Sequence, residues 1–158
     1  MITIVHATTE EHYEDARNLF VEYADSLGFD LEFQDFSREL ASLQGQYAPP
    51  QGCILLANDS EHVIGCVALR PFEDTICEMK RLYVIPAYRG RGVGRILARA
   101  VINAARKAGY AKMRLDTIAS MKAARTLYSS LGFYAIESYR YNPMEDTAYM
   151  ELDLEALS

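Results

Sequence analysis

Residues 76–108 read ICEMKRLYVIPAYRGRGVGRILARAVINAARKA. The run Ile76–Ile85 is rich in β-branched and aromatic residues, which is typical of a strand. From Val93 onward the apolar residues recur every three or four positions, which indicates one buried face of a helix, and Gly109 is a common helix stop. Between the two lies the loop Arg89-Gly90-Arg91-Gly92-Val93-Gly94. The stretch therefore predicts a strand, a loop of arginines and glycines, and a long helix in direct succession.

The chain after this helix continues the same pattern. Tyr110–Thr117 alternates apolar and polar residues as a strand does, and the strand–loop–helix–strand order predicts that it runs parallel to the strand before the loop. A last helix follows, which Ser120 can cap and Gly132 closes. Phe133–Tyr141 and Thr147–Leu154 predict a final pair of strands.

The chain before residue 76 predicts further strands and helices. A capping box at Thr8-Thr9-Glu10-Glu11, in which the Thr8 hydroxyl and the Glu11 carboxylate satisfy free amides, opens a helix that Gly28 ends, and Asp35 can cap a shorter helix through about Leu43. Strands are expected at Ile2–His6, Cys53–Asn58 and His62–Arg70. The fold class is therefore α/β (α+β), with one domain over residues 1–158 and a mixed central sheet of about seven strands with flanking helices.

Composition excludes several classes of protein. The chain has 158 residues, of which 50% are apolar and 24% charged, and a net charge of −6. No apolar run approaches the roughly 18 residues of a spanning helix, and residues 1–5 are typical of a strand instead of a signal peptide, so a cytoplasmic location without a membrane partner is expected. The negative charge argues against nucleic-acid binding and mildly favours a cationic substrate.

The three cysteines do not indicate a reactive or metal-binding site. Cys53, Cys66 and Cys77 lie inside apolar runs, without a close pair and without histidines at metal-ligand spacing. We expect them to be small core residues, and no metal is expected.

The loop Arg89–Gly94 has the features of an anion site. It precedes a helix whose first amides lack intrahelical partners and whose dipole is positive at this end. Its glycines let the backbone approach a ligand closely, and Arg89, Arg91, Arg95 and Arg99 concentrate positive charge on an otherwise acidic protein. The sequence therefore predicts a polyphosphorylated ligand.

Two familiar phosphate-binding loops do not match this one. A P-loop requires lysine and then serine or threonine after its last glycine, but Gly94 is followed by Arg95 and Ile96. A dinucleotide fingerprint that starts at Gly90 requires glycine at position 95, where arginine stands. Neither ATP nor NAD is favoured.

Two motifs resemble one known family. The spacing Arg-x-x-Gly-x-Gly of residues 89–94, after the strand and before an alanine-rich helix, resembles the coenzyme A motif of the GNAT acetyltransferase superfamily. Downstream, residues 124–133 read ARTLYSSLGF, which is similar to the family segment Ala-x-x-Leu-Tyr-x-x-x-Gly-Phe. The matches together cover Ile76 to about Phe133. The resemblance implies a single GNAT-like acetyltransferase domain that uses acetyl-CoA as co-substrate and no metal.

The resemblance also implies roles for residues that match the motifs. The amides of Arg89, Gly90, Arg91, Gly92, Val93, Gly94 and Arg95 would hold the pyrophosphate. The amides of Leu82, Tyr83 and Val84, on a strand splayed from its neighbour, would pair with pantetheine and with the thioester carbonyl. Tyr128 matches the tyrosine that donates a proton or a hydrogen bond to the departing thiolate. Because the reference pKa of tyrosine is about 10 and that of a thiol about 8.5, we expect a hydrogen bond to developing charge.

The residues on the acceptor side carry no specific motif. Glu78 is the best-placed carboxylate to act as a base, directly or through a water, provided that burial raises its pKa, and Asp116 is a second candidate. Arg140 and Tyr141 belong to a polar, aromatic loop expected over the acceptor side, where Arg140 could hold an acceptor carboxylate.

The sequence thus predicts an acyl-CoA-dependent N-acyltransferase (EC 2.3.1.-). It would move an acetyl group from acetyl-CoA to the primary amine of a small molecule, such as an amino acid or a related carboxylated amine, or of a peptide. Transfer would be direct, in a ternary complex. The alternatives are a non-catalytic coenzyme A sensor or binding module, and an adaptor-like domain that grips a partner's phosphates. A homodimer is a further possibility, because dimers are the commonest soluble assembly.

Overall fold

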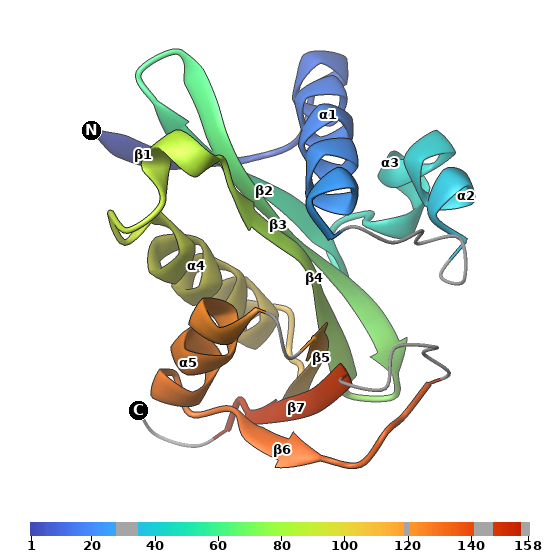
Figure 1. The fold of residues 1–158 in the computed structure, drawn as a ribbon. Coiled ribbons are helices and arrows are strands. Elements are labelled where there is room, and N and C mark those ends of the chain that lie inside the picture. Colours follow the sequence, from blue (N-terminus) through green and yellow to red (C-terminus); the bar gives the residue numbers. More distant parts are fainter. Residues whose placement is uncertain (28–34, 119–120, 141–146, 156–158) are drawn as a thin grey trace.

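The frame of the fold is one mixed sheet. The computed structural model describes residues 1–27, 35–118, 121–140 and 147–155. In this part the sheet has seven strands in the order β1-β2-β3-β4-β5-β7-β6 (Figure 1). The strands are β1 (Ile2–His6), β2 (Cys53–Asp59), β3 (His62–Glu73), β4 (Ile76–Val84), β5 (Lys112–Ile118), β6 (Tyr134–Ile136) and β7 (Thr147–Asp153). The predicted α/β class with a mixed sheet of about seven strands is confirmed.

Helices cover both faces of the sheet. One face carries α1, α2 and α3, and the other carries α4 and α5 (Figure 1). The helices are α1 (Glu10–Leu27), α2 (Phe36–Ala41), α3 (Leu43–Gln46), α4 (Val93–Lys107) and α5 (Lys122–Ser130), with a 3₁₀ turn η2 (Pro86–Tyr88) between β4 and α4. The central strands are therefore buried on both sides.

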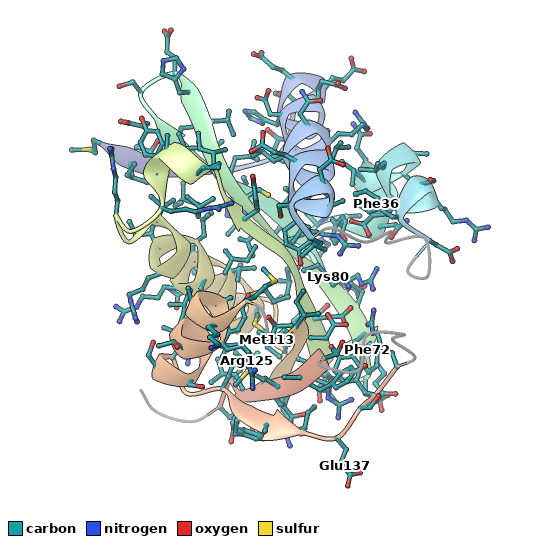
Figure 2. All side chains as sticks on the ribbon, in the orientation of Figure 1. Phe36, Phe72, Lys80, Met113, Arg125 and Glu137 are labelled. Atoms are coloured by element: carbon teal, nitrogen blue, oxygen red, sulfur yellow. The ribbon has the colours of Figure 1, made fainter. Side chains whose placement is uncertain are left out.

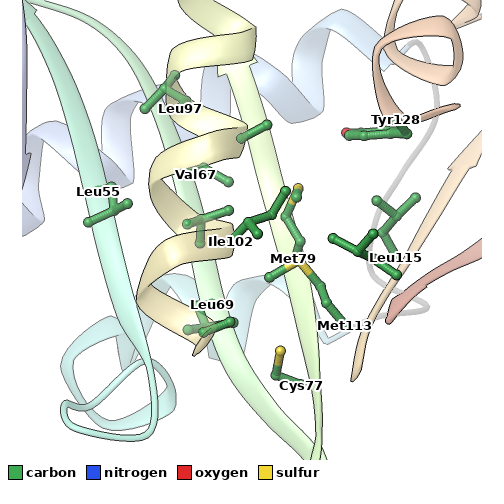
Figure 3. Packing of buried hydrophobic residues seen from close by; sticks show 14 of the residues in the cluster. Leu55, Val67, Leu69, Cys77, Met79, Leu97, Ile102, Met113, Leu115 and Tyr128 are labelled. Atoms are coloured by element: carbon green, nitrogen blue, oxygen red, sulfur yellow. The ribbon is translucent and has the colours of Figure 1, made fainter. Parts of the chain in front are cut away.

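Alternation along the strands divides the core into two clusters. On β2, Leu55 faces the cluster that contains α4, whereas Ile54 and Leu56 face the cluster that contains α1. Figure 3 shows Leu97 and Ile102 of α4 above the strand residues of the first cluster. Because α4 packs on the strands through these residues, the position of its N-terminus relative to the sheet is fixed.

Among the strands of the described residues there is one parallel pair, β4 with β5, and every other neighbouring pair is antiparallel. The sequence predicts this parallel pair from the strand–loop–helix–strand order. A parallel pair needs a crossover connection, and here η2, the arginine-glycine loop and α4 provide it. The start of α4 therefore lies at the end of β4.

The start of α1 differs by one residue from the predicted capping box. Thr9, not Thr8, accepts a hydrogen bond through its hydroxyl from the backbone N–H of His12 (3.1 Å). The His12 ring nitrogen Nδ1 in turn accepts from the Thr8 and Thr9 amides (3.0 and 3.3 Å). The imidazole thus replaces the expected Glu11 carboxylate, because it reaches back to the same free amides.

Several predicted boundaries also shift. The helix expected from Asp35 to about Leu43 breaks into α2 and α3, and the Asp35 side chain makes no capping bond. The strand expected at Phe133–Tyr141 is limited to β6, which pairs with β7 at only three positions. Gly28 and Ser120, expected at helix ends, lie outside the described residues.

Candidate active site

The strands β4 and β5 separate in the middle of the sheet. In the described residues they pair at three positions only, from Ile76 opposite Lys112 to Glu78 opposite Arg114. Beyond Glu78, β4 continues along β3 to Val84 while β5 continues along β7. The splay that the family resemblance implies is therefore present, and it opens the sheet next to the end of β4.

A groove follows this opening and reaches the arginine-glycine loop. Its volume is about 590 Å³, which is within the range of small-molecule sites. It brings together most of the residues that the sequence predicts for coenzyme A. Those lining the groove are Leu82, Tyr83, Val84, Arg89, Gly90, Gly92, Val93 and Gly94. Ala124 and Leu127 of α5 form part of the other wall.

The loop adopts a conformation that only glycine tolerates well. Gly90 and Gly92 have φ of 78° and 82°, in the left-handed region. A Cβ added at either glycine would meet no atom within 4 Å, so the space in front of this backbone is open. The first bond inside α4 joins the Ile96 amide to the Gly92 carbonyl (3.1 Å), which leaves the amides just before Ile96 available to a ligand. This geometry fits a pyrophosphate.

The arginines of the loop differ in their contacts. Arg89 donates from Nε to the Val84 carbonyl (3.1 Å), and its guanidinium lies 5.5 Å from the centre of the Tyr83 ring. Arg91 and Arg95 do not line the groove: Arg91 stacks over Tyr88, and Arg95 donates to the Ser130 hydroxyl (3.0 Å). Their side chains are thus engaged outside the groove.

Tyr128 lies at the inner end of the opening. Its ring is 7% exposed and packs against Phe133, with ring centres 5.7 Å apart. Figure 3 shows the hydroxyl pointing away from α5 toward β4. Burial, with smaller effects of Tyr23 and Asp116, raises the pKa of Tyr128. The hydroxyl therefore keeps its proton and remains a hydrogen-bond donor.

A small cavity of about 20 Å³ adjoins Tyr128, which is room for about one water molecule. It is also lined by Tyr23, Lys80, Asp116 and Thr117. Among the described residues, Asp116 Oδ2 and Thr117 Oγ1 are buried and have no hydrogen-bond partner. Buried polar atoms are normally satisfied, so these two atoms are available to a water or a ligand.

Glu78 lies nearby but is fully engaged. Its side chain is 0% exposed, and Oε1 accepts from Arg70 (3.0 Å), whereas Oε2 accepts from the Tyr139 hydroxyl (2.8 Å) and from Arg140. Burial acts to raise the pKa of Glu78, but the charges of Lys80, Arg140 and Arg70 outweigh it and lower the pKa to about 2. The raised pKa that a base role requires is thus absent, because three cations surround this carboxylate.

Arg140, which the sequence predicts on the acceptor side, pairs with Glu78. Its guanidinium lies over the rings of Tyr139 (5.2 Å) and Phe72 (5.9 Å). Its Nε is buried without a hydrogen-bond partner among the described residues. Tyr141, the other predicted acceptor residue, lies outside the described residues.

Some residues of the site are not predicted from the sequence. Lys80 is 4% exposed on β4, and burial, with a smaller effect of the Arg81 charge, lowers its pKa to about 8. Glu39 of α2 pairs with Arg81 of β4 in the interior. The sequence feature that could have indicated them is the run Glu78–Arg81. It places three charged residues in a strand expected at the centre of a sheet, where charges must be paired or functional.

The cysteines are all buried, as predicted. Burial raises the pKa of Cys53 to about 11, and burial also raises the pKa of Cys77, to about 12. Neither thiol would be an active nucleophile near neutral pH. In the described residues there is no cluster of three or more side chains suited to a metal ion, and no helix is long and apolar enough to cross a membrane.

An open helix N-terminus, a splayed strand beside it and a buried tyrosine in the adjoining cavity are the features expected of a coenzyme A-dependent acyltransferase. The comparison with known families agrees. The model described as "Acetyltransferase (GNAT) family" matches residues 6–133. The chain belongs to the GNAT family of N-acetyltransferases, whose members use acetyl-CoA, and the resemblance stated from the two motifs is confirmed.

Relatives and solved structures cover nearly the whole chain. An uncharacterized N-acetyltransferase of Schizosaccharomyces pombe is 40% identical over 156 residues, 97% of this chain and 95% of the relative. A GNAT-family acetyltransferase of Staphylococcus aureus has a TM-score of 0.81 at 20% identity, covering 98% of this chain and 100% of that one. A Salmonella typhimurium protein solved with its cofactor acetyl-CoA has a TM-score of 0.70 at 21% identity, covering 99% and 96%. The two structures show that the fold is shared.

Proposed function

We propose that this chain transfers an acetyl group from acetyl-CoA to a primary amine by direct attack in a ternary complex. One observation carries the proposal: Leu82 and Met121 line both the large groove and the small cavity beside Tyr128. The groove with the anion site at α4 and the cavity beside the buried tyrosine therefore adjoin each other at these two residues. A long phosphorylated thioester held at the anion site would bring its acyl group toward the tyrosine.

The donor would be held mainly by backbone groups. The free amides at the start of α4 suit the pyrophosphate, and the glycines Gly90 and Gly92 leave room for it. Leu82, Tyr83 and Val84, at the end of β4 where β5 has departed, would pair with the pantetheine arm as a missing strand would. Arg89 adds positive charge at the junction of these two parts.

The leaving group would be stabilised by Tyr128. When the acceptor nitrogen bonds to the carbonyl carbon, the carbon–sulfur bond breaks and negative charge develops on sulfur. A buried hydroxyl that keeps its proton can donate a hydrogen bond to that sulfur in a place from which most water is excluded. The coenzyme then leaves as a thiolate and takes its proton from solvent.

The proton of the attacking amine needs an acceptor. A lysine-like ammonium costs roughly 4–5 kcal/mol to deprotonate at neutral pH. Both oxygens of Glu78 are occupied by cations and Tyr139, whereas Asp116 has a buried oxygen that bonds to no described residue and lies beside a cavity that can hold a water. We therefore propose that Asp116 accepts the proton of the attacking amine through that water. Glu78 would instead hold Arg140 in place.

The acceptor is proposed to be a carboxylated amine. Arg140 keeps a buried Nε that no described residue uses, and Arg70 and Lys80 add positive charge on the same side of β4. A carboxylate could complete the hydrogen bonds of this guanidinium. A small amine with an adjacent carboxylate, such as an amino acid, or a peptide terminus would suit such a site.

A panel assay tests the function. The chain is incubated with acetyl-CoA and amino acids, their decarboxylated analogues, polyamines and peptides, and thiol release is followed. We expect release with carboxylated amines, and in Arg140→Ala a KM increased about 10-fold or more for these acceptors only. An unchanged KM for every carboxylated acceptor would refute the role of Arg140. Coenzyme A binding without turnover on any acceptor would support the non-catalytic sensor.

A further inference from the structure

The backbone of β4 has an unusual conformation at the point where β5 leaves it. Arg81 has φ of 61°, in the left-handed region that residues with a Cβ rarely adopt. Lys80 lies opposite Ala68 and Tyr83 opposite Cys66, so two residues of β4 stand against one of β3. This is a β-bulge, and its second residue, Leu82, lines both the groove and the Tyr128 cavity.

The Arg81 side chain is fixed by contacts from two other elements, α1 and α2. Nε and one terminal nitrogen of its guanidinium donate to Glu39 Oε2 and Oε1 of α2 (3.0 and 2.7 Å), and both side chains are almost completely buried, at 3% and 2% exposure. The guanidinium also lies 5.2 Å from the ring centre of Phe36 and 5.9 Å from that of Tyr23. Figure 2 labels Phe36 at the start of α2.

The Arg81 backbone is held as well. The Cys66 thiol of β3 donates to the Arg81 carbonyl (3.3 Å), and burial raises the pKa of this thiol, so it keeps the proton it donates. In a trans peptide the N–H points opposite to the C=O. The Leu82 N–H therefore points away from Cys66.

A buried ion pair is a poor source of stability, because well-packed apolar residues of similar volume often serve as well or better. A left-handed arginine, in contrast, needs surrounding contacts that over-determine it. The bidentate geometry supplies such contacts, since a planar guanidinium held at two points fixes both the position and the direction of the side chain. The pair is thus better suited to hold a conformation than to add stability.

We propose that the Glu39–Arg81 pair positions the bulge so that the Leu82 N–H donates to the thioester carbonyl of the bound donor. Glu39 and Arg81 are positioning residues, because neither needs to touch the substrate. The inference rests on the proposed function and deepens it. It also connects α2, on the face of the sheet opposite to α4, with the reacting carbonyl.

Two double variants test the proposal. Glu39→Met with Arg81→Met removes both charges and keeps apolar volume, whereas Glu39→Met with Arg81→Gly removes the same charges but accepts a positive φ without strain. We expect the first variant to fold and to bind coenzyme A within about twofold of wild type, while kcat falls about 10- to 100-fold, as for loss of an oxyanion donor. The glycine variant should recover part of kcat. Glu151→Gln, which disturbs the ion pair with Arg114 on β5, is the matched control and should keep kcat.

A spectroscopic readout separates this inference from the proposed function. The infrared stretch of carbonyl-labelled acetyl-CoA should shift to lower frequency on binding to wild type, and the shift should be lost in the methionine double variant. Wild-type kcat and an unchanged carbonyl shift in that variant would overturn the positioning role alone. Absence of turnover by wild type with the shift present would overturn the proposed transfer and leave the positioning role supported.

Discussion

Tyr128 and Asp116 face the same small cavity but contribute opposite properties. The tyrosine keeps a proton because it is buried, and the aspartate offers an oxygen that no described residue occupies. One group can therefore donate to the departing sulfur while the other accepts from the attacking nitrogen through a water. These two roles require Tyr128 and Asp116 to lie close together, and both residues line the small cavity next to the point where β4 and β5 separate.

Substitution of either residue should affect chemistry more than binding. Tyr128→Phe removes the donor and Asp116→Asn removes the negative charge, so each should lower kcat by about 10- to 100-fold with the Kd of coenzyme A unchanged. Steady-state thiol release and calorimetric titration measure the two quantities. Tyr110→Phe is the control, because the Tyr110 hydroxyl bonds to the Gln51 carbonyl outside the site. Full activity in Tyr128→Phe would exclude its proposed role.

Glu78 should appear in the pH dependence of stability. Its pKa is about 2 in the folded chain and 4.5 for the free group, so the ionised carboxylate favours folding. That contribution is fully present above pH 4.5 and is lost as the pH falls toward 2, and it amounts to at most about 3 kcal/mol. Denaturant unfolding at several pH values should show that the free energy of unfolding of Glu78→Gln falls less steeply with decreasing pH than that of wild type.

The control for this measurement is Glu137→Gln. Glu137 is exposed after β6 and points away from the sheet (Figure 2). We expect this variant to keep the acid dependence of wild type. If the free energy of unfolding fell equally with decreasing pH in Glu78→Gln and in wild type, the three cations would not stabilise the carboxylate.

At the scale of elements, the proposed anion site is made by one continuous segment. The loop leads directly from β4 into α4, and Gly92 caps the helix with φ of 82°. Any residue with a Cβ is strained there and would also fill the space in front of the amides. Gly90 and Gly92 therefore determine both the start of the helix and the open space through which an anion can reach its amides.

The Gly92→Val variant should bind coenzyme A about 10-fold or more weakly, because the side chain strains the cap and blocks the anion. Calorimetric titration measures the loss. Gly45→Val is the matched control, since an added Cβ at Gly45 also meets no atom within 4 Å but the backbone there does not lie in the left-handed region. If Gly92→Val and wild type bound coenzyme A with equal affinity, the loop would not be part of the donor site.

The elements that the sequence predicts well are those encoded by neighbours in the chain. The period of α4, the loop glycines and the Leu127-Tyr128 segment all depend on nearby residues, so the groove could be foreseen. The bulge at Arg81 could not, because Glu39, which pairs with it, lies 42 residues away. The pKa of Glu78 depends likewise on Tyr139 and Arg140, 61 and 62 residues away.

At the scale of the whole molecule, the proposed donor and acceptor sides lie on opposite faces of the sheet. The helices α4 and α5 on one face carry the proposed anion site and Tyr128, and α1 and α2 on the other face contact Arg81 through Tyr23 and Phe36 (Figure 1). The small cavity beside Asp116 is lined by Tyr23 of α1 from one face and by Tyr128 of α5 from the other. In the proposed function, this arrangement would let donor and acceptor be bound at the same time, which is what direct transfer requires.

Initial-rate kinetics with both substrates varied tests this claim most directly. Direct transfer predicts intersecting double-reciprocal lines, with acetylated acceptor formed in equal amount to free coenzyme A and no acetyl group retained on the protein by mass spectrometry. Parallel lines together with an acetylated enzyme would contradict it, because they indicate a covalent intermediate.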